Sequence, residues 1–163
     1  TYTTTNSLGL AASFGVVPQM TMSAWIFLKV SGSNFKIVTL TSGTDDFAGI
    51  RVNSFNTIYI TFCQGRFMSP TYTAQDNTWI HVTITVDGPQ DITRIYIDGV
   101  LMKEELNAVK ICNSSTVDVK DLVIGNHGSI DDVRLYNRIL SATEVEALCP
   151  RDMRGLIFHA PYD

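Results

Sequence analysis

The strongest constraint on the fold is a strict alternation of apolar and polar side chains in residues 79–88, WIHVTITVDG. The apolar side comprises Ile80, Val82, Ile84 and Val86, and the polar side comprises His81, Thr83 and Thr85. A period of two residues is typical of a β-strand with one buried face. Residues 93–101, TRIYIDGVL, continue the pattern with Ile95 and Ile97 inward and Tyr96 outward, and Asp98-Gly99 is a two-residue hairpin signal. We therefore predict a long antiparallel hairpin.

Strand-like stretches recur along the rest of the chain. They cover residues 20–30, 36–40, 49–53, 56–63, 119–125, 131–136 and 155–160. Val, Ile and Thr are abundant whereas Glu occurs four times, and this composition favours pleated surfaces over helices. About nine strands separated by Ser, Gly, Asn and Asp turns predict an all-β fold made of two antiparallel sheets. A length of 163 residues fits one domain, residues 1–163.

One short helix is predicted near the C-terminal end, in residues 141–148, SATEVEAL. Ser141 is a suitable N-cap, and Glu144, three residues later, completes a capping box. The apolar stripe of this helix comprises Ala142, Val145 and Leu148, and Pro150 ends it.

Charge and hydropathy exclude two classes of partner. The net charge is −4 and no run of Lys or Arg occurs, so nucleic acid is not an expected partner. The longest apolar stretches have the length of a strand, well below the roughly 20 residues that span a bilayer, so no membrane insertion is expected. The chain begins at Thr1 rather than Met, which suggests a processed or excised piece.

The three cysteines, Cys63, Cys112 and Cys149, are widely spaced and lack a C-x-x-C pair. One disulfide with a leftover thiol and three buried free thiols are both compatible with this pattern. The cysteines therefore do not identify the compartment.

Three ordered segments resemble the concanavalin A-like lectin/glucanase superfamily, and within it the laminin G-like jelly-roll modules. They are residues 20–30, MTMSAWIFLKV; residues 79–102, WIHVTITVDGPQDITRIYIDGVLM; and residues 122–148, LVIGNHGSIDDVRLYNRILSATEVEAL. The resemblance implies a two-sheet jelly-roll sandwich with one short helix. It also implies that Trp25 and Trp79 are structural.

The last nine residues, GLIFHAPYD (155–163), depart from the family order, because modules of this family usually begin with such a strand. Two interpretations remain. The segment is either the first strand of a following module or a closing strand of this sandwich. We favour the closing strand, since an unpaired edge beside residues 131–136 would be a template for aggregation.

Two adjacent carboxylates, Asp131 and Asp132, interrupt a stretch that otherwise reads as a strand. Alternation places Asp131 on the core side with Val133, and Asp132 outward with Arg134. A carboxylate at the core margin needs a partner, because an isolated buried charge is costly. Three roles are compatible: acceptor for backbone amides, partner of an arginine, or calcium ligand, with the first favoured.

The resemblance implies that many family members hold a structural calcium ion between the opening strand and the last strands. In this sequence Asp131, Asp132 and Asp163 would be its ligands. A second oxygen cluster, Asp45-Asp46, is more simply interpreted as part of a solvated loop.

The sequence does not predict an enzyme. Retaining glycosidases of the resembling fold carry two carboxylates on one strand in the order Glu-x-Asp-x-(x)-Glu, and this motif is absent. No G-x-S-x-G elbow accompanies His81, His127 or His159.

A sugar-binding surface is the favoured site, because aromatic faces stack on pyranose rings while polar side chains bind the hydroxyls. Alternation points Tyr59 and Tyr96 outward, with Arg51, Asn53 and Thr61 in the same pattern, as a platform on one sheet. His127, in the loop GNHGS, is a further candidate.

These observations predict a non-catalytic recognition or adhesion module, part of a larger extracellular or surface-exposed protein. A glycan is the favoured partner, on the basis of the resemblance, and a surface protein is the other. The alternatives are a protein-binding or structural module and a glycoside hydrolase of the same fold.

Overall fold

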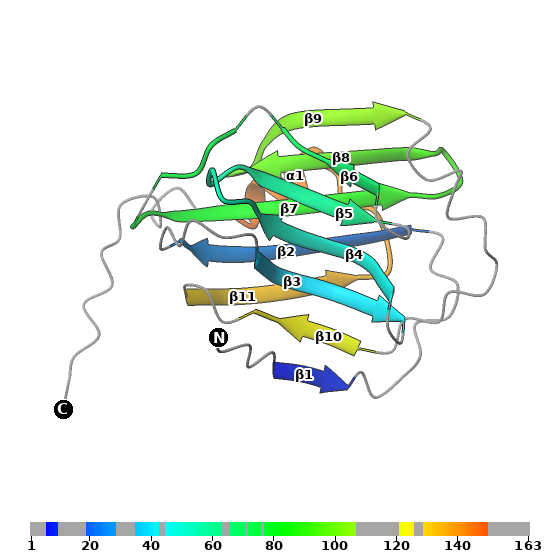
Figure 1. Ribbon diagram of the computed structural model, residues 1–163. Coiled ribbons are helices and arrows are strands. Elements are labelled where there is room, and N and C mark those ends of the chain that lie inside the picture. Colours follow the sequence, from blue (N-terminus) through cyan, green and yellow to red (C-terminus); the bar gives the residue numbers. More distant parts are fainter. Residues whose placement is uncertain are drawn as a thin grey trace.

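The fold is a sandwich of two antiparallel sheets with one short helix (Figure 1). The computed structural model describes residues 6–9, 19–28, 35–42, 45–62, 66–70, 72–75, 77–106, 121–125 and 129–149. In Figure 1 the six-stranded sheet lies in front of the five-stranded sheet, and the helix α1 (Ala142–Ala147) lies on the far side of the five-stranded sheet. The predicted all-β jelly-roll architecture is confirmed.

Each sheet combines strands that are distant in sequence. The six-stranded sheet has the order β1 (Asn6–Gly9), β10 (Asp121–Ile124), β3 (Phe35–Ser42), β4 (Asp45–Val52), β5 (Ile58–Phe62) and β6 (Arg66–Met68). The five-stranded sheet has the order β11 (Ser129–Tyr136), β2 (Gln19–Phe27), β7 (Trp79–Asp87), β8 (Ile92–Ile97) and β9 (Val100–Leu106). Every neighbouring pair is antiparallel.

The core lies between the two sheets and follows the period-two pattern of their strands. In the six-stranded sheet Val38, Ile50 and Ile60 occupy one row across the ladder, and all three are fully buried. In the five-stranded sheet the inward row contains Ile84 and Ile95, also fully buried. Burying such side chains contributes about 1.5–3 kcal/mol each. The predicted inward positions of the hairpin are therefore confirmed.

The strand β7 is buried on both faces, because the segment after β11 lies on its outer side. Thr83 and Thr85 are predicted to point away from the core, yet both have no exposed surface. Thr21 of β2 fixes the covering segment: its hydroxyl donates to the Arg138 carbonyl oxygen at 2.8 Å and accepts from the Leu140 amide at 3.0 Å. Alternation predicted the direction of these side chains and not what covers them.

The predicted local signals are present. Asp98 and Gly99 have φ values of 49° and 78°, as a two-residue hairpin turn requires. The capping box of α1 forms: the Ser141 hydroxyl accepts from the Glu144 amide at 3.2 Å, and the Glu144 carboxylate accepts from the Ser141 amide at 2.8 Å. Trp25 is buried and β7 begins at Trp79, as predicted.

Two short strands, β1 and β6, were not predicted. They have four and three residues, too few for a periodic pattern to be recognised. The stretch 155–160 and the question of a closing strand lie outside the described residues. No helix in the described part of the chain is long and apolar enough to cross a bilayer.

At one edge of the sandwich, Lys103 of β9 connects the two sheets. It lies opposite the buried Ile95, on the inner side of its sheet. Its ammonium group donates to the Ser69 carbonyl oxygen, just after β6, at 3.4 Å. Four apolar side chains of β9 are exposed to solvent: Val100, Leu101, Met102 and Leu106.

Candidate functional site

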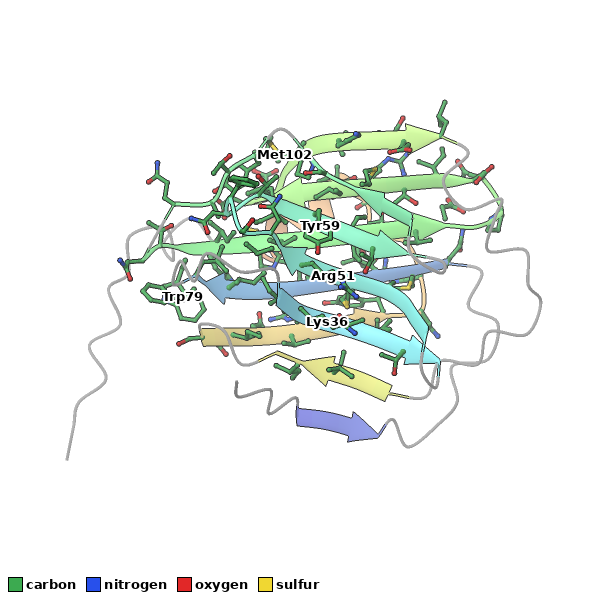
Figure 2. All side chains as sticks on the ribbon, viewed as in Figure 1. Lys36, Arg51, Tyr59, Trp79 and Met102 are labelled. Atoms are coloured by element: carbon green, nitrogen blue, oxygen red, sulfur yellow. The ribbon has the colours of Figure 1, made fainter. Side chains whose placement is uncertain are left out.

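The outer face of the six-stranded sheet carries a row of three polar or aromatic side chains. Arg51 of β4 lies opposite Lys36 of β3 in one ladder and opposite Tyr59 of β5 in the next. Figure 2 shows these three labelled side chains one above another across the three strands. Each is half-buried. We call Lys36, Arg51 and Tyr59 the outer-face row.

The arginine of the outer-face row is held in place by its neighbour on β5. The Nε of Arg51 donates to the Thr61 hydroxyl at 3.2 Å, and Thr61 lies two residues beyond Tyr59 on the same face. Burial, followed by the positive charge of Arg51, lowers the pKa of Lys36 below its usual value. The row therefore combines a positioned guanidinium, a second cation and an aromatic ring.

The part of β4 that lies beside the outer-face row requires glycine at position 49. Gly49 lies opposite both Thr39 and Thr61 in its ladders. A Cβ atom at this position would lie 2.7 Å from the Thr39 hydroxyl oxygen, which is much closer than normal packing permits. Thr39 has no exposed surface, and its hydroxyl has no hydrogen-bond partner among the described residues.

Asn53, which was predicted to contact a ligand, has a structural role in the loop after β4. The side-chain carbonyl oxygen of Asn53 accepts from the backbone amides of Phe55 at 2.9 Å and Thr57 at 3.0 Å. This pattern is an Asx turn that closes the β4–β5 hairpin. Asn53 shapes the loop next to the outer-face row.

The predicted platform of Tyr59 and Tyr96 on one sheet is wrong. Tyr96 belongs to β8 of the five-stranded sheet, and only 5% of it is exposed. Its ring packs with Leu140 and Val145, the residues that dock α1. Burial is the main reason why the pKa of the Tyr96 hydroxyl is raised. Tyr96 anchors the helix, whereas Tyr59, Arg51 and Thr61 share the outer face of the six-stranded sheet.

The doublet Asp131-Asp132 forms a β-bulge. Asp131 lies opposite Trp25 and Arg134 lies opposite Ser23, so two residues of β11 face one residue of β2. Asp132 adopts a φ of 48°, the left-handed conformation that Asp tolerates better than most residues. The extra residue resets the alternation, and Asp131 is exposed. The predicted core-side position of Asp131 is therefore wrong.

The two carboxylates of the bulge each accept a hydrogen bond from a nearby group of β11. The carboxylate of Asp131 accepts from the Asp132 amide at 2.8 Å, and that of Asp132 accepts from the Arg134 Nε at 2.7 Å. The hydrogen bond to Asp132 is the main cause that raises the pKa of Arg134. Amide acceptor and arginine partner, two of the three predicted roles, are both observed, each for one residue.

Calcium binding by Asp131, Asp132 and Asp163 stays a prediction. The described residues contain no group of three His, Cys, Asp or Glu side chains able to hold a metal ion, and Asp163 lies outside them. The arginine already paired with Asp132 would have to move for a divalent cation to bind there.

A melting experiment decides the calcium prediction. If the three aspartates hold a structural ion, a chelator lowers the melting temperature and added calcium restores it, because an ion that binds only the folded state stabilises it. Thermal unfolding followed by circular dichroism, with Asp132→Asn as the variant that no longer responds, measures this. A melting temperature that neither the chelator nor calcium changes would contradict the prediction of a structural calcium ion.

The structure also brings together two residues, His81 and Cys149, that no sequence pattern paired. The Nδ1 of His81 lies 2.8 Å from the sulfur of Cys149, and the rings of His81 and Trp25 lie 5.1 Å apart. His81 is 1% exposed and Cys149 is 2% exposed. Burial lowers the pKa of His81 to about 4, so the imidazole is neutral at pH 7.

Other predicted positions fall where the structure gives no side-chain detail. His127, Cys63 and Cys112 lie outside the described residues. Asp45 and Asp46 belong to β4 rather than to a loop, although their side chains are not described. Lys36, by contrast, was not among the predicted site residues, because only the strand register reveals that it lies opposite Arg51.

Comparison with solved structures supports the fold assignment. A heptameric pentraxin from Limulus polyphemus matches with a TM-score of 0.67 and 16% identity, over 88% of this chain and 75% of the pentraxin. Trypanosoma rangeli sialidase matches with a TM-score of 0.67 and 16% identity, over 86% of this chain and 24% of the sialidase. At these identities the likeness shows the fold alone.

A third similar structure is that of botulinum neurotoxin type C, whose cell entry depends on interaction with two ganglioside molecules. It matches with a TM-score of 0.67 and 14% identity, over 91% of this chain and 42% of the toxin chain. The chain thus spans about a quarter of the sialidase and less than half of the toxin structure. No curated protein sequence matches the chain.

The family comparison covers most of the sequence. The model of the concanavalin A-like lectin/glucanases superfamily, of the laminin G type, matches residues 2–146. This span includes every described strand and nearly all of the helix. The chain is a member of the concanavalin A-like lectin/glucanase superfamily.

Proposed function

We propose that the protein is a non-catalytic carbohydrate-recognition module and that it binds its ligand on the outer face of the six-stranded sheet. The observation that carries the proposal is the outer-face row, in which Tyr59 lies beside the positioned guanidinium of Arg51. The family and the ganglioside-dependent toxin among the similar structures support a saccharide as the ligand.

The chemistry of the row suits a sugar ring. The face of a tyrosine ring packs against the C–H groups of a pyranose, while arginine and lysine donate hydrogen bonds to its oxygens. The five-stranded sheet offers no equivalent surface at Tyr96, because the segment with Leu140 and Val145 covers that ring. The outer face of the six-stranded sheet is therefore the better site.

We also propose that the module works within a larger extracellular or surface-exposed protein. Folds like this one make up about a quarter of the sialidase chain and less than half of the neurotoxin chain, which supports a role as one part of a longer protein. Other parts of such a protein would supply any further activity.

Replacing Tyr59 with Ala is expected to weaken glycan binding by about tenfold or more, since the stacking contact is lost; tenfold equals about 1.4 kcal/mol. Binding measured on a glycan panel and by titration calorimetry, with circular dichroism to confirm the fold, tests this. Phe55→Ala is the matched control, because Phe55 is 79% exposed at the tip of the neighbouring hairpin.

Two results would contradict the proposal. Unchanged glycan binding by Tyr59→Ala would move the site away from the outer-face row. Cleaved glycans, detected by mass spectrometry after incubation and abolished by a single carboxylate substitution, would make the protein a glycoside hydrolase instead.

A protein-binding module is the second candidate function, and the exposed apolar side chains of β9 favour it. Val100 is 59% exposed and Leu106 is 60% exposed, and Leu101 and Met102 of the same strand are exposed as well. Exposed apolar side chains that gather on one element are typical of protein contacts. A glycan panel without any binding, together with a partner whose binding is lost in Val100→Ser, would support this function.

A further inference from the structure

One short segment, residues 138–149, closes the outer face of the five-stranded sheet, and we call it the cover. It contains α1, which lies on the far side of this sheet in Figure 1. The cover packs through Leu140 and Val145 on the ring of Tyr96. The Thr21 hydroxyl also exchanges hydrogen bonds with two backbone groups at the start of the cover. A small number of contacts therefore holds this segment on the sheet.

Two separate hydrophobic clusters hold the cover and the sandwich. The cluster under the cover contains Tyr96, Leu140 and Val145, whereas the far larger cluster between the two sheets contains none of these residues. The helix α1 has six residues, and an isolated helix of that length is not stable in water. The cover can therefore leave the sheet, and unfold as it leaves, without opening the core between the sheets.

His81 of β7 lies at the contact between the sheet and the cover. Its Nδ1 is 2.8 Å from the sulfur of Cys149, the last residue of the cover, and 3.4 Å from the Thr83 hydroxyl oxygen. Its Nε2 is buried and has no hydrogen-bond partner among the described residues. The ring of Trp25 packs beside the imidazole. With the cover in place, the side chain of His81 is shielded from water.

A proton added to His81 would make both ring nitrogens hydrogen-bond donors. The Nδ1 has the sulfur of Cys149 and the hydroxyl of Thr83 as acceptors, but the Nε2–H would have none among the described residues. A buried donor without an acceptor costs free energy, and so does a buried charge. Departure of the cover would let water solvate the imidazolium and would remove both costs.

The charged groups around His81 do not offset these costs. On β11, Asp132 favours the protonated imidazole and Arg134 opposes it, and these two residues form an ion pair at 2.7 Å. In the turn after β8, the carboxylate of Asp98 accepts from the backbone amide of His81 at 2.9 Å. The cover contributes the sulfur of Cys149. Burial remains the main reason why the pKa of His81 is lowered.

We propose that His81 is a pH-sensitive switch, whose protonation releases the cover from the five-stranded sheet while the two sheets stay folded. Each release couples the uptake of one proton by the imidazole to the exposure of Tyr96 and of the outer side of β7. Acid would thus uncover a surface that is closed at neutral pH. This inference concerns the other sheet and does not depend on the proposed carbohydrate site.

Hydrogen exchange of single amides, followed by NMR between pH 6.5 and pH 4, tests the proposal. We expect the protection factors of the hydrogen-bonded amides of Leu140, Val145 and Cys149 to fall by about a hundredfold, since the pKa of His81 is 6.5 when exposed and about 4 when buried. At pH 4, amides of β4 and β5 should stay about tenfold or more better protected. Low urea concentrations should barely change exchange in the cover, because its release exposes little surface.

Two variants separate the proton from the stability of the cover. His81→Gln cannot take up the proton, so protection of its cover should stay within about twofold across the interval. Thr21→Val removes two hydrogen bonds to the cover and should lower its protection about tenfold at both pH values, without affecting β4 and β5. If His81→Gln does not fold, the wild type decides, because one proton per release predicts a loss of about tenfold per pH unit below pH 6.5.

Three results would overturn the proposal. Equal protection of the cover at both pH values would show that the protonated imidazole stays buried. Loss of protection in the cover, β4 and β5 together, with one urea dependence, would show that the proton acts only by unfolding the whole domain. A loss in His81→Gln as large as in the wild type would assign the proton to another group.

Discussion

Between pH 6.5 and pH 4, the free energy of unfolding is expected to fall by about 3 kcal/mol because of one residue, His81. In the unfolded chain its imidazole takes up a proton near pH 6.5. In the folded protein, burial lowers the pKa of His81 to about 4. The unfolded state therefore binds more protons in this interval. The contribution is fully present above pH 6.5 and is lost as the pH falls toward 4.

Urea unfolding at several pH values, compared between the wild type and His81→Gln, measures this effect. Glutamine does not titrate, so its curve should lack the additional slope. If the variant does not fold, the imidazole resonances of the wild type give a second measurement, since His81 should titrate near pH 4. An imidazole that titrates near 6.5 in the folded protein would contradict the prediction.

Gly125→Ala is expected to destabilise the protein by about 3 kcal/mol or more, the second large effect. Gly125 follows β10, and its amide donates to the Ile37 carbonyl oxygen at 2.8 Å. An added Cβ atom would collide with the backbone carbonyl oxygen of Lys36, and a backbone atom cannot rotate away as a side chain can. The strand β3, which carries the first residue of the outer-face row, would have to move.

Gly49→Ala provides the comparison, because there the added atom would meet the side chain of Thr39. We expect a loss of about 1–3 kcal/mol, partly recovered when Thr39→Ala is combined with it, because that change removes the two nearest atoms and leaves the Thr39 Cβ 3.1 Å away. No single side-chain truncation should rescue Gly125→Ala. Melting temperatures and urea midpoints measure both, and a fully stable Gly125→Ala would show that the contact between β10 and β3 is looser than described.

The fold was predictable from the sequence wherever a stretch is long enough to show a period or contains residues that define a particular turn or helix cap. The alternation of β7 and the turn at Asp98-Gly99 are signals of these two kinds, and so is the capping box at Ser141. The strand β6, with three residues, carries neither kind, and its place depends on pairing with β5. Tertiary pairing alone defines such an element.

The site was less predictable because side-chain direction and side-chain exposure are different properties. Alternation correctly turned Tyr96 away from the core, but the helix that covers it is placed by contacts far along the chain, such as those of Thr21. The bulge at Asp131-Asp132 shifted a register that strict alternation assumed to be continuous. Lys36 entered the site only through the strand order.

The lysine that connects the two sheets bears on how molecules of this protein behave when crowded. A second copy that approached β9 sideways, to extend the five-stranded sheet, would come up against Lys103 and would risk removing its ammonium group from water. Inward-turned charge on an outermost strand discourages such sideways growth. We therefore expect Lys103 to oppose fibre growth along this edge, although Val100 and Leu106 are exposed there.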